Sequence, residues 1–565
     1  MKVPHLNDIV SVLSARSSSE DLAYVFLADG TPDTETRWTF GDTATHAAAF
    51  AAHLSERGIG SGDRVVLAAD PGLDYIAALY GTMSLGAVPV PCFPPLRSKD
   101  ADRFHAIARD CGPRAIVIDA TYRQQVSAIR DRLKADTLDP DIVHPEHVAP
   151  TLTEFTPDAV APDDIALIQY TSGSTGTPKG VCLTHDNLVS NCEALERNMG
   201  TDPGRVGLSW LPPYHDMGLM GTIILSMYGG WPLVLMSPMH FVQQPSRWLE
   251  AISEYGISIT VGPNFSLDLC VDSVCDEEIG HLDLSTVRQL YCGAEPVSAA
   301  TLARFEDKFA AQGFDARAII PCYGMAEATL FVSGKVPGSA HRTIRIAESD
   351  GKDRTVVSCG PADGEHAVRI IEPTNLTTVE DGRVGEVWIS GRSVAAGYYN
   401  HPGLTREAFH ARLADDDREY LRTGDLGFVE SGELFVTGRI KDLIIVNGRN
   451  IYPQDVEAAA VGADPDIRTA VAFSIGDDST EQLCIVAEAR HRDLSAADHS
   501  RIGEAIKSSV TAEFGIGPRI CLCPKGAIPT TTSGKVRRHE TKRMLLTNAL
   551  RSLQPPAPAM QGCLT

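Results

Sequence analysis

The hydrophobic positions in the first half of the chain follow two alternating patterns. Short apolar runs at 63–69, 114–119 and 165–170 are separated by longer stretches such as AAAFAAHLSERG (47–58), where apolar residues recur with helical spacing. Buried parallel strands appear in a sequence as short continuous apolar runs, and the intervening helices cover the sheet. The pattern predicts β-α-β units and hence an α/β fold. Residues 131–164 are polar and rich in proline, which predicts a surface loop.

The second half of the chain changes its pattern twice. The segments VGEVWISGRSVAAGYY (384–399) and GELFVTGRI (432–440) are bounded by Gly and Asn turns and predict a β-rich subregion. Beyond Gly438 a mixed pattern follows, with a helix expected over 496–514, and it predicts a small α+β domain. We therefore expect a large N-terminal domain of covered β-sheets plus the β-rich subregion at 1–438, a small mobile α+β domain at 439–551, and a flexible tail at 552–565.

Composition and charge narrow the possible functions. With 565 residues, 43% hydrophobic and 22% charged, the chain is long enough for more than one core and lacks the composition of a disordered protein. The net charge of −23 repels a nucleic acid backbone at long range, so nucleic acid is not an expected partner. A small polyanion such as ATP stays possible, because local dipoles, a metal ion and a few cations decide its binding.

Neither the cysteines nor the chain's apolar segments indicate a zinc site or a membrane anchor. Thirteen cysteines are scattered without a C-x-x-C pair, which favours reduced, buried thiols. The first residues lack a basic segment followed by an apolar run, and no window reaches the roughly 18 apolar residues of a membrane span. We expect a cytoplasmic protein with no membrane span.

A loop suited to phosphate binding follows the apolar run at 165–170. The segment TSGSTGTPKG (171–180) contains three glycines, five hydroxyl side chains and Lys179, so backbone N–H groups, hydroxyls and one cation can converge on an anion. It does not fit G-x-x-x-x-G-K-[ST], because Pro178 precedes the lysine and Gly180 follows it. The alternative is a flexible Ser/Gly-rich surface loop, which a direct connection to a buried strand disfavours.

This loop resembles the phosphate loop of the adenylate-forming superfamily, which includes acyl-CoA synthetases, peptide-synthetase adenylation domains and luciferases. Further motifs of the superfamily recur in order along the chain. Details such as WLPPYHDMGLMG and RNIYPQDVE are most similar to the fatty acyl-AMP ligase branch. The motifs are LPPYHDMGL (211–219), CGAEP (292–296), YGMAEATL (323–330), YLRTGD (420–425), GRIKDLIIVNGRNIYPQDVE (438–457) and TTTSGKVRR (530–538).

The resemblance implies a site for ATP and Mg²⁺. Glu327 would ligate Mg²⁺, and its alternative is a buried glutamate that caps a helix. Tyr323 would stack on the adenine, and Asp425, assisted by Arg439, would accept the ribose hydroxyls; a turn residue is the alternative for Asp425. The remaining nucleotide-binding residues implied are Thr171, Ser172, Gly173, Ser174, Thr175, Gly176, Thr177 and Lys179 for phosphate, and Gly293, Ala294, Glu295, Gly324, Met325 and Ala326 around the base.

The resemblance also implies which residues act in catalysis. Lys535 would reach the substrate carboxylate and the α-phosphate, with a solvated surface lysine as the alternative. His215 would orient the acyl carboxylate, although a packed structural histidine is also possible, and Lys179 would act at the phosphates. Lys441 occupies the position of the hinge about which the small domain rotates. Apolar residues after His215, with Phe241, Phe265 and Leu267, offer surface for an acyl tunnel, although plain core is the alternative.

The expected activity is ATP-dependent formation of acyl-AMP from a fatty acid, followed by transfer of the acyl group to an acyl carrier protein. A fatty acyl-CoA synthetase shares the same catalytic motifs and stays open as the alternative. In the resembling ligases an insertion disfavours coenzyme A, and the corresponding stretch here, 331–355, is short. An amino-acid or aryl-acid adenylating enzyme is disfavoured, because only Asp216 could meet an ammonium group. A nucleotide-binding scaffold without catalysis would not need Lys535 on the small domain.

Overall fold

The computed structural model of the chain describes residues 6–95, 98–150, 155–171, 178–347, 353–446, 449–476, 482–491, 494–530 and 536–553. It divides into two compact units. The first comprises 1–344, 355–423 and 427–436, and the second comprises 345–354, 424–426 and 437–565. The mixed α/β architecture confirms the predicted fold class.

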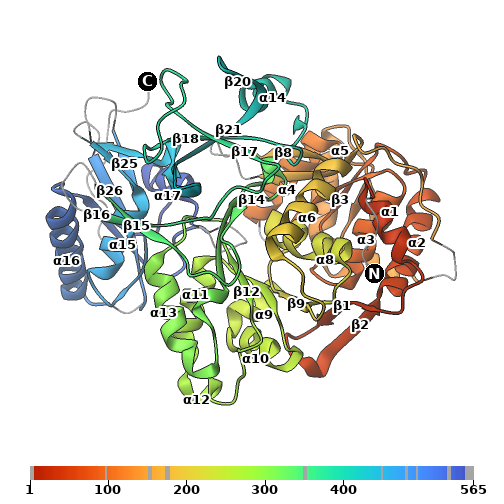
Figure 1. Cartoon of the computed structure of the whole chain (residues 1–565), viewed down its shortest axis with the longest axis horizontal. Helices are drawn as coiled ribbons and strands as arrows, with labels where there is room; N and C mark the ends of the chain where they lie inside the picture. Colours follow the sequence, from red (N-terminus) through yellow and green to blue (C-terminus); the bar gives the residue numbers. More distant parts are fainter. Residues whose placement is uncertain are drawn as a thin grey trace. The chain divides into compact units, whose positions relative to one another are not determined.

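The largest sheet of the first unit has eight strands in the order β14-β13-β12-β11-β9-β10-β1-β2 (Figure 1). Its inner pairs are parallel, and antiparallel strands close both edges. Such a sheet needs helices on its faces. The strands are β1 (Leu22–Leu27), β2 (Glu35–Thr39), β9 (Gly207–Ser209), β10 (Leu233–Met236), β11 (Ile259–Val261), β12 (Gln289–Cys292), β13 (Ile319–Gly324) and β14 (Phe331–Gly334).

Helices of the first unit begin where the sequence supplies side chains that cap them. A capping box of Thr184 and Asn187 starts α6 (His185–Met199), and one of Thr39 and Asp42 starts α2 (Phe40–Ser55). The other long helices of this unit are α1 (Ile9–Arg16), α3 (Leu73–Ser84), α4 (Ser98–Cys111), α5 (Arg123–Ala135), α10 (Ser246–Tyr255), α11 (Asn264–Ser273) and α13 (Ala299–Phe309).

A second sheet in this unit corrects one sequence-based expectation. Residues 131–164 were expected to form a surface loop, but they contain the end of α5 and the strand β6 (Asp141–Val143). This strand pairs in parallel with β5 (Ala115–Val117) and completes the sheet β4-β3-β5-β6, together with β3 (Arg64–Leu67) and β4 (Val88–Pro91). Three residues between polar neighbours are too few to produce a recognisable apolar run.

Smaller sheets contain the β7–β8 hairpin and the β-rich segment. A three-stranded sheet has the order β19-β8-β7, and a five-stranded sheet has the order β17-β18-β21-β20 with β22 paired to β21. The β-rich subregion expected around 384–440 is confirmed. These strands are β7 (Ile165–Thr171), β8 (Lys179–Thr184), β17 (Ala367–Ile371), β18 (Gly385–Ser390), β19 (Gly397–Tyr398), β20 (Ala411–Leu413), β21 (Asp416–Glu430) and β22 (Glu433–Arg439). In a separate two-stranded sheet, β15 (Thr343–Ala347) pairs with β16 (Asp353–Val357).

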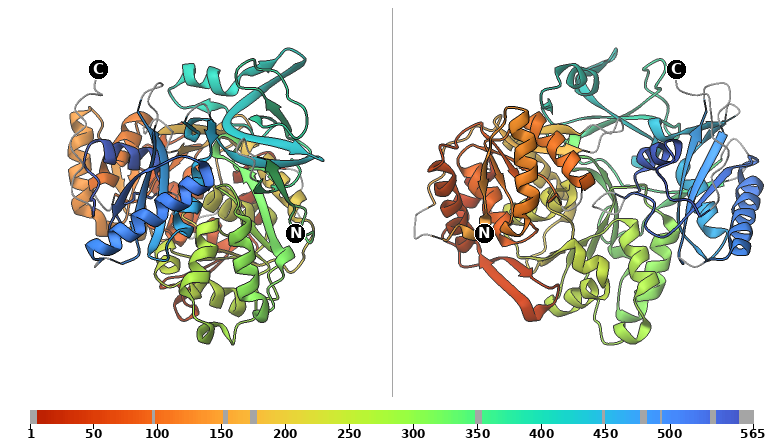
Figure 2. Two further views of the ribbon diagram at one scale, coloured as in Figure 1. Left: turned by 90° about the vertical axis from the view of Figure 1, so that its left-hand side faces the viewer. Right: turned by 180° about the vertical axis from the view of Figure 1, so that it is seen from behind.

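The second unit is a three-stranded sheet between helices, drawn in blue in Figures 1 and 2. Alternate residues of β25 (Ile467–Ile475) and β26 (Gln482–Ala489) face two separate cores: α15 (Pro453–Gly462) and α16 (Ala496–Phe514) contribute to one, and α17 (Arg538–Leu546) to the other. Strand β27 (Arg519–Cys523) pairs in parallel with β26, and β23 (Ile444–Val446) pairs with β24 (Arg449–Ile451). The helix predicted at 496–514 has these bounds, set by a Ser495 capping box and by Gly515.

Across the described residues, no helix combines the length and apolarity needed to cross a bilayer.

Candidate functional site

Three of the sequence motifs meet at one edge of the eight-stranded sheet. The strands β9, β11, β12 and β13 are adjacent and parallel, so their carboxyl ends lie at the same edge. LPPYHDMGL begins two residues after β9, and Gly293–Glu295 directly follows β12. Glu327 lies three residues after β13. Open α/β sheets bind ligands at the carboxyl ends of their parallel strands, so the topology itself brings the expected nucleotide and acyl residues together.

Close backbone contact explains the glycines of the two nucleotide motifs. A Cβ added at Gly293 would lie 2.8 Å from Cys322 Sγ, and one at Gly324 would lie 1.7 Å from the carbonyl oxygen of Leu330. Ala294 has a φ of 71°, a left-handed conformation that costs energy in a non-glycine residue. Tyr323, expected to stack on the adenine, is buried. Because Cys292 at the end of β12 pairs with Pro321 of β13, Tyr323 lies next to the loop that follows β12.

The hairpin of β7 and β8, which flanks the expected phosphate loop, is named the phosphate hairpin. Tyr398, which the sequence motifs did not indicate, joins this hairpin to the YGMAEATL motif. The hydroxyl of Tyr398 donates a hydrogen bond to Glu327 Oε1 at 3.0 Å, and Lys179 Nζ lies 5.0 Å from the centre of the same phenol ring. Thr171 is the register partner of Lys179 across the β7–β8 hairpin. Burial and the neighbouring Glu327 carboxylate raise the pKa of Tyr398, so the phenol stays a neutral donor. Lys179, Tyr398 and Glu327 therefore form one cluster.

Strand β19 holds Tyr398 in this position. Tyr398 pairs with Val181 of β8, its backbone N–H donates to Thr405 Oγ1 at 2.9 Å, and its ring packs against Phe409 with centroids 5.1 Å apart. Tyr398 belongs to VGEVWISGRSVAAGYY (384–399), whose pattern predicts only a β-rich segment. No sequence signal assigns its partner, since Glu327 lies 71 positions away.

Gly180 has a packing role besides the one expected at the phosphate. A Cβ there would lie 2.7 Å from Ile168 Cγ2 and 2.9 Å from Tyr170 Cζ. Gly180 therefore serves packing within the hairpin. The other loop residues expected to bind phosphate, Ser172, Gly173, Ser174, Thr175, Gly176 and Thr177, lie outside the described residues.

LPPYHDMGL (211–219), the motif expected to bind the acyl group and named the acyl motif, begins a short helix and contacts the phosphate hairpin. His215 is the N-cap of α7 (Asp216–Gly218), and its Nδ1 lies 2.7 Å from Asp216 Oδ1. Gln169 of β7 donates a hydrogen bond from Nε2 to the carbonyl of Tyr214 at 2.8 Å. A Cβ at Gly218 would lie 2.3 Å from the Pro212 carbonyl oxygen, so the sharp fold of HDMG requires glycine. His215 is partly exposed beside the strand that leads into the phosphate loop.

Aromatic side chains form a wall beside this motif. Phe241 stacks on Trp210 with centroids 4.0 Å apart, and Phe265 meets Trp210 edge to face at 5.8 Å. Leu267 is fully buried. Phe241 and Phe265 thus pack against Trp210, and the role of these residues and of Leu267 in an acyl tunnel stays a prediction.

The second unit holds the expected ribose-binding pair. Asp425 is 5% exposed, and Arg439 Nε donates to its Oδ1 at 2.9 Å. Lys441, the expected hinge residue, is exposed in a 3₁₀ turn, Ile440–Asp442, that directly follows β22. Lys535 lies outside the described residues; Thr530 and Val536, the described residues on either side of 531–535, form an isolated bridge.

Similarity to known proteins agrees with this arrangement. The family described as AMP-binding enzyme matches residues 13–399. The medium-chain-fatty-acid–[acyl-carrier-protein] ligase JamA of Moorena producens is 34% identical, with 97% of each chain covered. The long-chain-fatty-acid–AMP ligase FadD32 of Mycolicibacterium smegmatis is also 34% identical, with 98% of this chain and 96% of that protein covered.

A solved structure shows the same likeness. A fatty acyl-adenylate ligase from L. pneumophila, in complex with acyl adenylate and pyrophosphate, is 34% identical with a TM-score of 0.75, over 97% of this chain and 98% of that one. The matches cover nearly the whole chain and agree with the motifs quoted from the sequence. The chain therefore belongs to the family of AMP-binding enzymes, and its resemblance to the adenylate-forming superfamily, most like the fatty acyl-AMP ligase branch, is confirmed.

Proposed function

We propose that this protein is an ATP-dependent ligase that converts a fatty acid to its acyl adenylate and passes the acyl group to the phosphopantetheine thiol of an acyl carrier protein. The observation that carries the proposal is the cluster of Lys179, Tyr398 and Glu327 beside the acyl motif, in a chain similar over nearly its full length to ligases of this kind. The cytoplasmic location expected from the sequence stays a prediction.

The first step joins two anions, so the protein must offset their repulsion. A carboxylate oxygen attacks the α-phosphorus of ATP, the bond to the bridging oxygen breaks, and pyrophosphate leaves. Lys179 supplies positive charge at the hairpin, and the N–H groups and hydroxyls of 171–177 would hold the β- and γ-phosphates. We assign Lys535 to the developing charge at the α-phosphate and the carboxylate.

Glu327 fits a place in a Mg²⁺ site that phosphate oxygens complete. It is a half-buried carboxylate at the carboxyl edge of the sheet, and Tyr398 orients one of its oxygens. Among the described residues no group of three or more His, Cys, Asp or Glu side chains could hold a metal by itself, so the remaining ligands would come from the nucleotide and water. A bound ion would supply charge neutralisation at the phosphates.

The nucleoside half has its own proposed contacts. Tyr323 and the backbone of Gly293–Glu295 would take the adenine, together with Gly324, Met325 and Ala326. Asp425 would accept the ribose hydroxyls with Arg439 as its partner. The small domain, 439–551, would act as a lid that turns at Lys441 between the two steps. In the second step the thiolate attacks the acyl carbon, and AMP leaves.

Coenzyme A is the second candidate acceptor. The stretch 331–355 that follows YGMAEATL is short, and its described part consists mainly of β14, β15 and the start of β16. Coenzyme A and a carrier protein both present the thiol of a phosphopantetheine group, so the chemistry of transfer alone does not separate the two acceptors.

Mass spectrometry of the products tests the proposal. The protein would be incubated with ATP, Mg²⁺ and fatty acids of graded length, alone, with coenzyme A, and with a phosphopantetheinylated carrier protein. We expect acyl-AMP that coenzyme A leaves intact and that the carrier protein consumes. Formation of acyl-CoA at a comparable rate would replace the proposed acceptor, and no acyl-AMP with any fatty acid would refute the ligase itself. Lys179→Ala serves as a matched inactive control.

A further inference from the structure

The acyl motif continues into a helix with an unusual hydrogen-bond register. After α7 the chain forms a π-helix, η4 (Leu219–Ile224), and then α8 (Leu225–Gly229). A π-helix is rare, occurs mostly as a single turn within α-helices, and is frequent at functional sites. The extra residue in the turn rotates the residues before it by about 100° relative to those after it. The direction in which His215–Gly218 faces therefore depends on this turn.

Hydroxyl groups from distant parts of the chain bind the end of the π-helix. The carbonyl oxygen of Ile223 accepts hydrogen bonds from Tyr24 Oη at 2.9 Å, Ser226 Oγ at 3.0 Å and Tyr80 Oη at 3.3 Å. The two phenol oxygens lie 3.2 Å apart. Both tyrosines are fully buried, Tyr24 on β1 and Tyr80 on α3. Each phenol has one proton, so the tyrosine that donates to the other phenol shares its proton with the Ile223 carbonyl. Together the three hydroxyl groups make Ile223 an anchored point of the helix.

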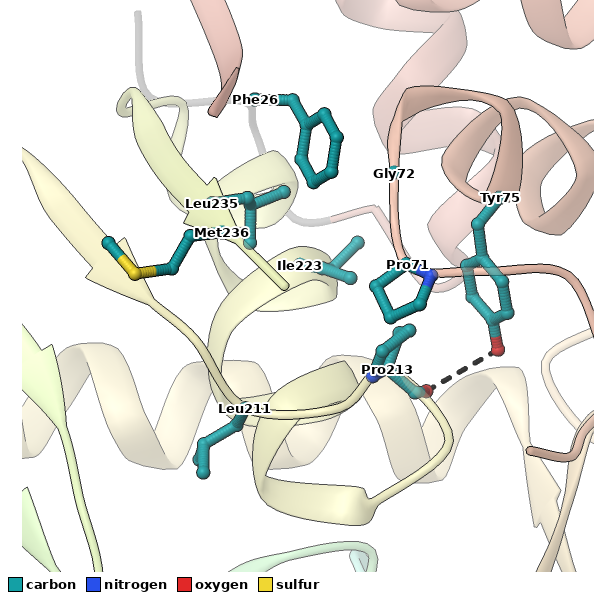
Figure 3. Close-up of a pocket in the computed structure, with 9 residues that line it drawn as sticks. All are labelled: Phe26, Pro71, Gly72, Tyr75, Leu211, Pro213, Ile223, Leu235 and Met236. Atoms are coloured by element: carbon teal, nitrogen blue, oxygen red, sulfur yellow. Dashed lines mark hydrogen bonds between the residues drawn. The ribbon is translucent and has the colours of Figure 1, made fainter. Parts of the chain in front are cut away.

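A third tyrosine, Tyr75 of α3, contacts the start of LPPYHDMGL. Tyr75 Oη donates to the carbonyl of Pro213 at 3.4 Å, and Figure 3 shows this bond beside a small apolar cavity that Pro213, Ile223 and Tyr75 help to line. The cavity holds about 10 Å³, room for roughly one water molecule, and so it is too small for an alkyl chain. Helix α3 therefore supports the acyl motif from the side of this cavity, at both Pro213 and Ile223.

Packing against the nucleotide motif depends on the same register. A Cβ at Gly221, in the middle of the π-helix, would lie 2.9 Å from Leu330 Cδ2. Leu330 ends YGMAEATL, three residues after Glu327. A rotation of about 100° would replace Gly221 at this contact by a larger neighbour, Met220 or Thr222, and would push the two motifs apart.

The three phenols are neutral hydrogen-bond donors. Burial raises the pKa of Tyr24, Tyr75 and Tyr80 above the ordinary value for a phenol. The anchor is thus a network of neutral hydroxyl groups.

We propose that Tyr24 and Tyr80 are positioning residues, which hold Leu219–Ile224 in the π-helical register and so set the orientation of His215 and Asp216 toward the fatty acid. The inference rests on the proposed function for the substrate that it names. Neither tyrosine belongs to a recognised motif. Both would control acyl binding rather than ATP binding.

The double variant Tyr24→Phe/Tyr80→Phe tests the inference. We expect KM for the preferred fatty acid to rise about tenfold, the consequence of lost hydrogen bonds to a buried carbonyl, and the chain-length preference to broaden, while KM for ATP stays within about twofold. Tyr291→Phe is the matched control, because it removes an equally buried hydroxyl, bonded to Asn198 Oδ1 at 2.7 Å, away from the π-helix. A double variant whose acyl KM equals that of the control would overturn the proposal.

Hydrogen exchange separates this inference from the proposed function. We expect the amides of 219–226 to exchange faster in the double variant than in the wild type or in Tyr291→Phe, and unchanged exchange would overturn the inference. If the wild-type protein forms no acyl-AMP, the proposed function fails, and the exchange comparison still decides whether the tyrosines hold the π-helix. Tyr80→Phe alone, which loses the longer bond to Ile223 and the contact with Tyr24 Oη but keeps the bond from Tyr24, replaces the double variant should the latter fail to fold.

Discussion

The contact between Tyr398 and Glu327 provides the most direct test of the site. Tyr398→Phe removes the hydroxyl that donates to Glu327 at 3.0 Å and keeps the ring that Lys179 faces at 5.0 Å. The ring stays in place because β19 and Phe409 hold it. The substitution therefore removes one interaction of the Lys179–Tyr398–Glu327 cluster and leaves the other.

The size of the effect follows from the charge of the acceptor. A hydrogen bond to a charged group contributes about 1.5–3 kcal/mol, which corresponds to about tenfold to a hundredfold in an equilibrium or rate constant. Glu327 is partly exposed, so water replaces part of the lost interaction, and we expect a loss of about tenfold. Tyr398→Leu also removes the cation–π contact, which contributes about 0.5–2 kcal/mol, and we expect a further loss of about fivefold.

ATP–pyrophosphate exchange at varied Mg²⁺ concentration measures both losses. For Tyr398→Phe we expect a lower kcat/KM for ATP and a higher Mg²⁺ concentration at half-maximal rate, because the carboxylate is no longer oriented. Tyr255→Phe is the control, since Tyr255 also donates to a glutamate, Glu35 Oε2 at 2.7 Å, outside the site. Should Tyr398→Phe match this control in both rate and Mg²⁺ requirement, the assignment of Glu327 to the metal and of Tyr398 to its orientation would be wrong.

Three further predictions concern catalysis, pH and stability. Lys535→Ala should abolish adenylate formation with only a modest loss of ATP affinity, because its charge acts in the transition state; unchanged turnover by pyrophosphate exchange would remove it from the mechanism. Burial raises the pKa of Asp119 to about 6, so the contribution of this carboxyl to stability is present below about pH 4 and is lost as the pH rises through 6. The Tm of the wild type minus the Tm of Asp119→Asn should therefore be larger at pH 4 than at pH 7. Gly72→Ser should raise the free energy of unfolding, measured by denaturant titration, by about 0.5–1 kcal/mol. Gly72 is the N-cap of α3, its backbone is extended, and an added Cβ would make only ordinary contacts with Phe26. A free energy of unfolding below that of the wild type would contradict this prediction.

The sequence predicted those features that depend on local pattern. Apolar runs identified the strands β3, β5 and β7, and α16 has the bounds that its helical pattern predicted. The motifs after β9, β12 and β13 could be expected to meet, because parallel strands place their carboxyl ends together. These inferences need only neighbouring residues and the rules of sheet topology.

Features that depend on distant partners could not be predicted. LMGTII is compatible with either an α-helix or a π-helix, and its register is held by tyrosines 143 and 199 positions away. Tyr398 gave no signal within an apolar strand segment. Strand β6 is recognisable only from its pairing with β5. In each case tertiary hydrogen bonds, which leave no local pattern, decide the structure.

The strained residues of the nucleotide motifs indicate how the site is prepared before substrates arrive. Thr329 has a φ of 66°, which a β-branched residue adopts at a cost of about 1–3 kcal/mol. Its hydroxyl donates to the carbonyl of Ser393, and Asn191 of α6 bonds the carbonyls of Ala328 and Phe331 and the N–H of Phe331. These bonds offset the strain and fix the turn that follows Glu327.

A turn fixed in this way presents a carboxylate without further ordering. Glu327 is held at its own backbone by the N–H of Ala395 and at its side chain by Tyr398, both from the segment that ends in β19. Since the groups that meet charge are already oriented, little reorganisation accompanies the reaction, which is the condition under which fixed charges lower a barrier most. In the proposed mechanism, backbone strain at Thr329 and the buried bonds of Asn191 would therefore help to orient Glu327, although neither residue would touch the reacting atoms.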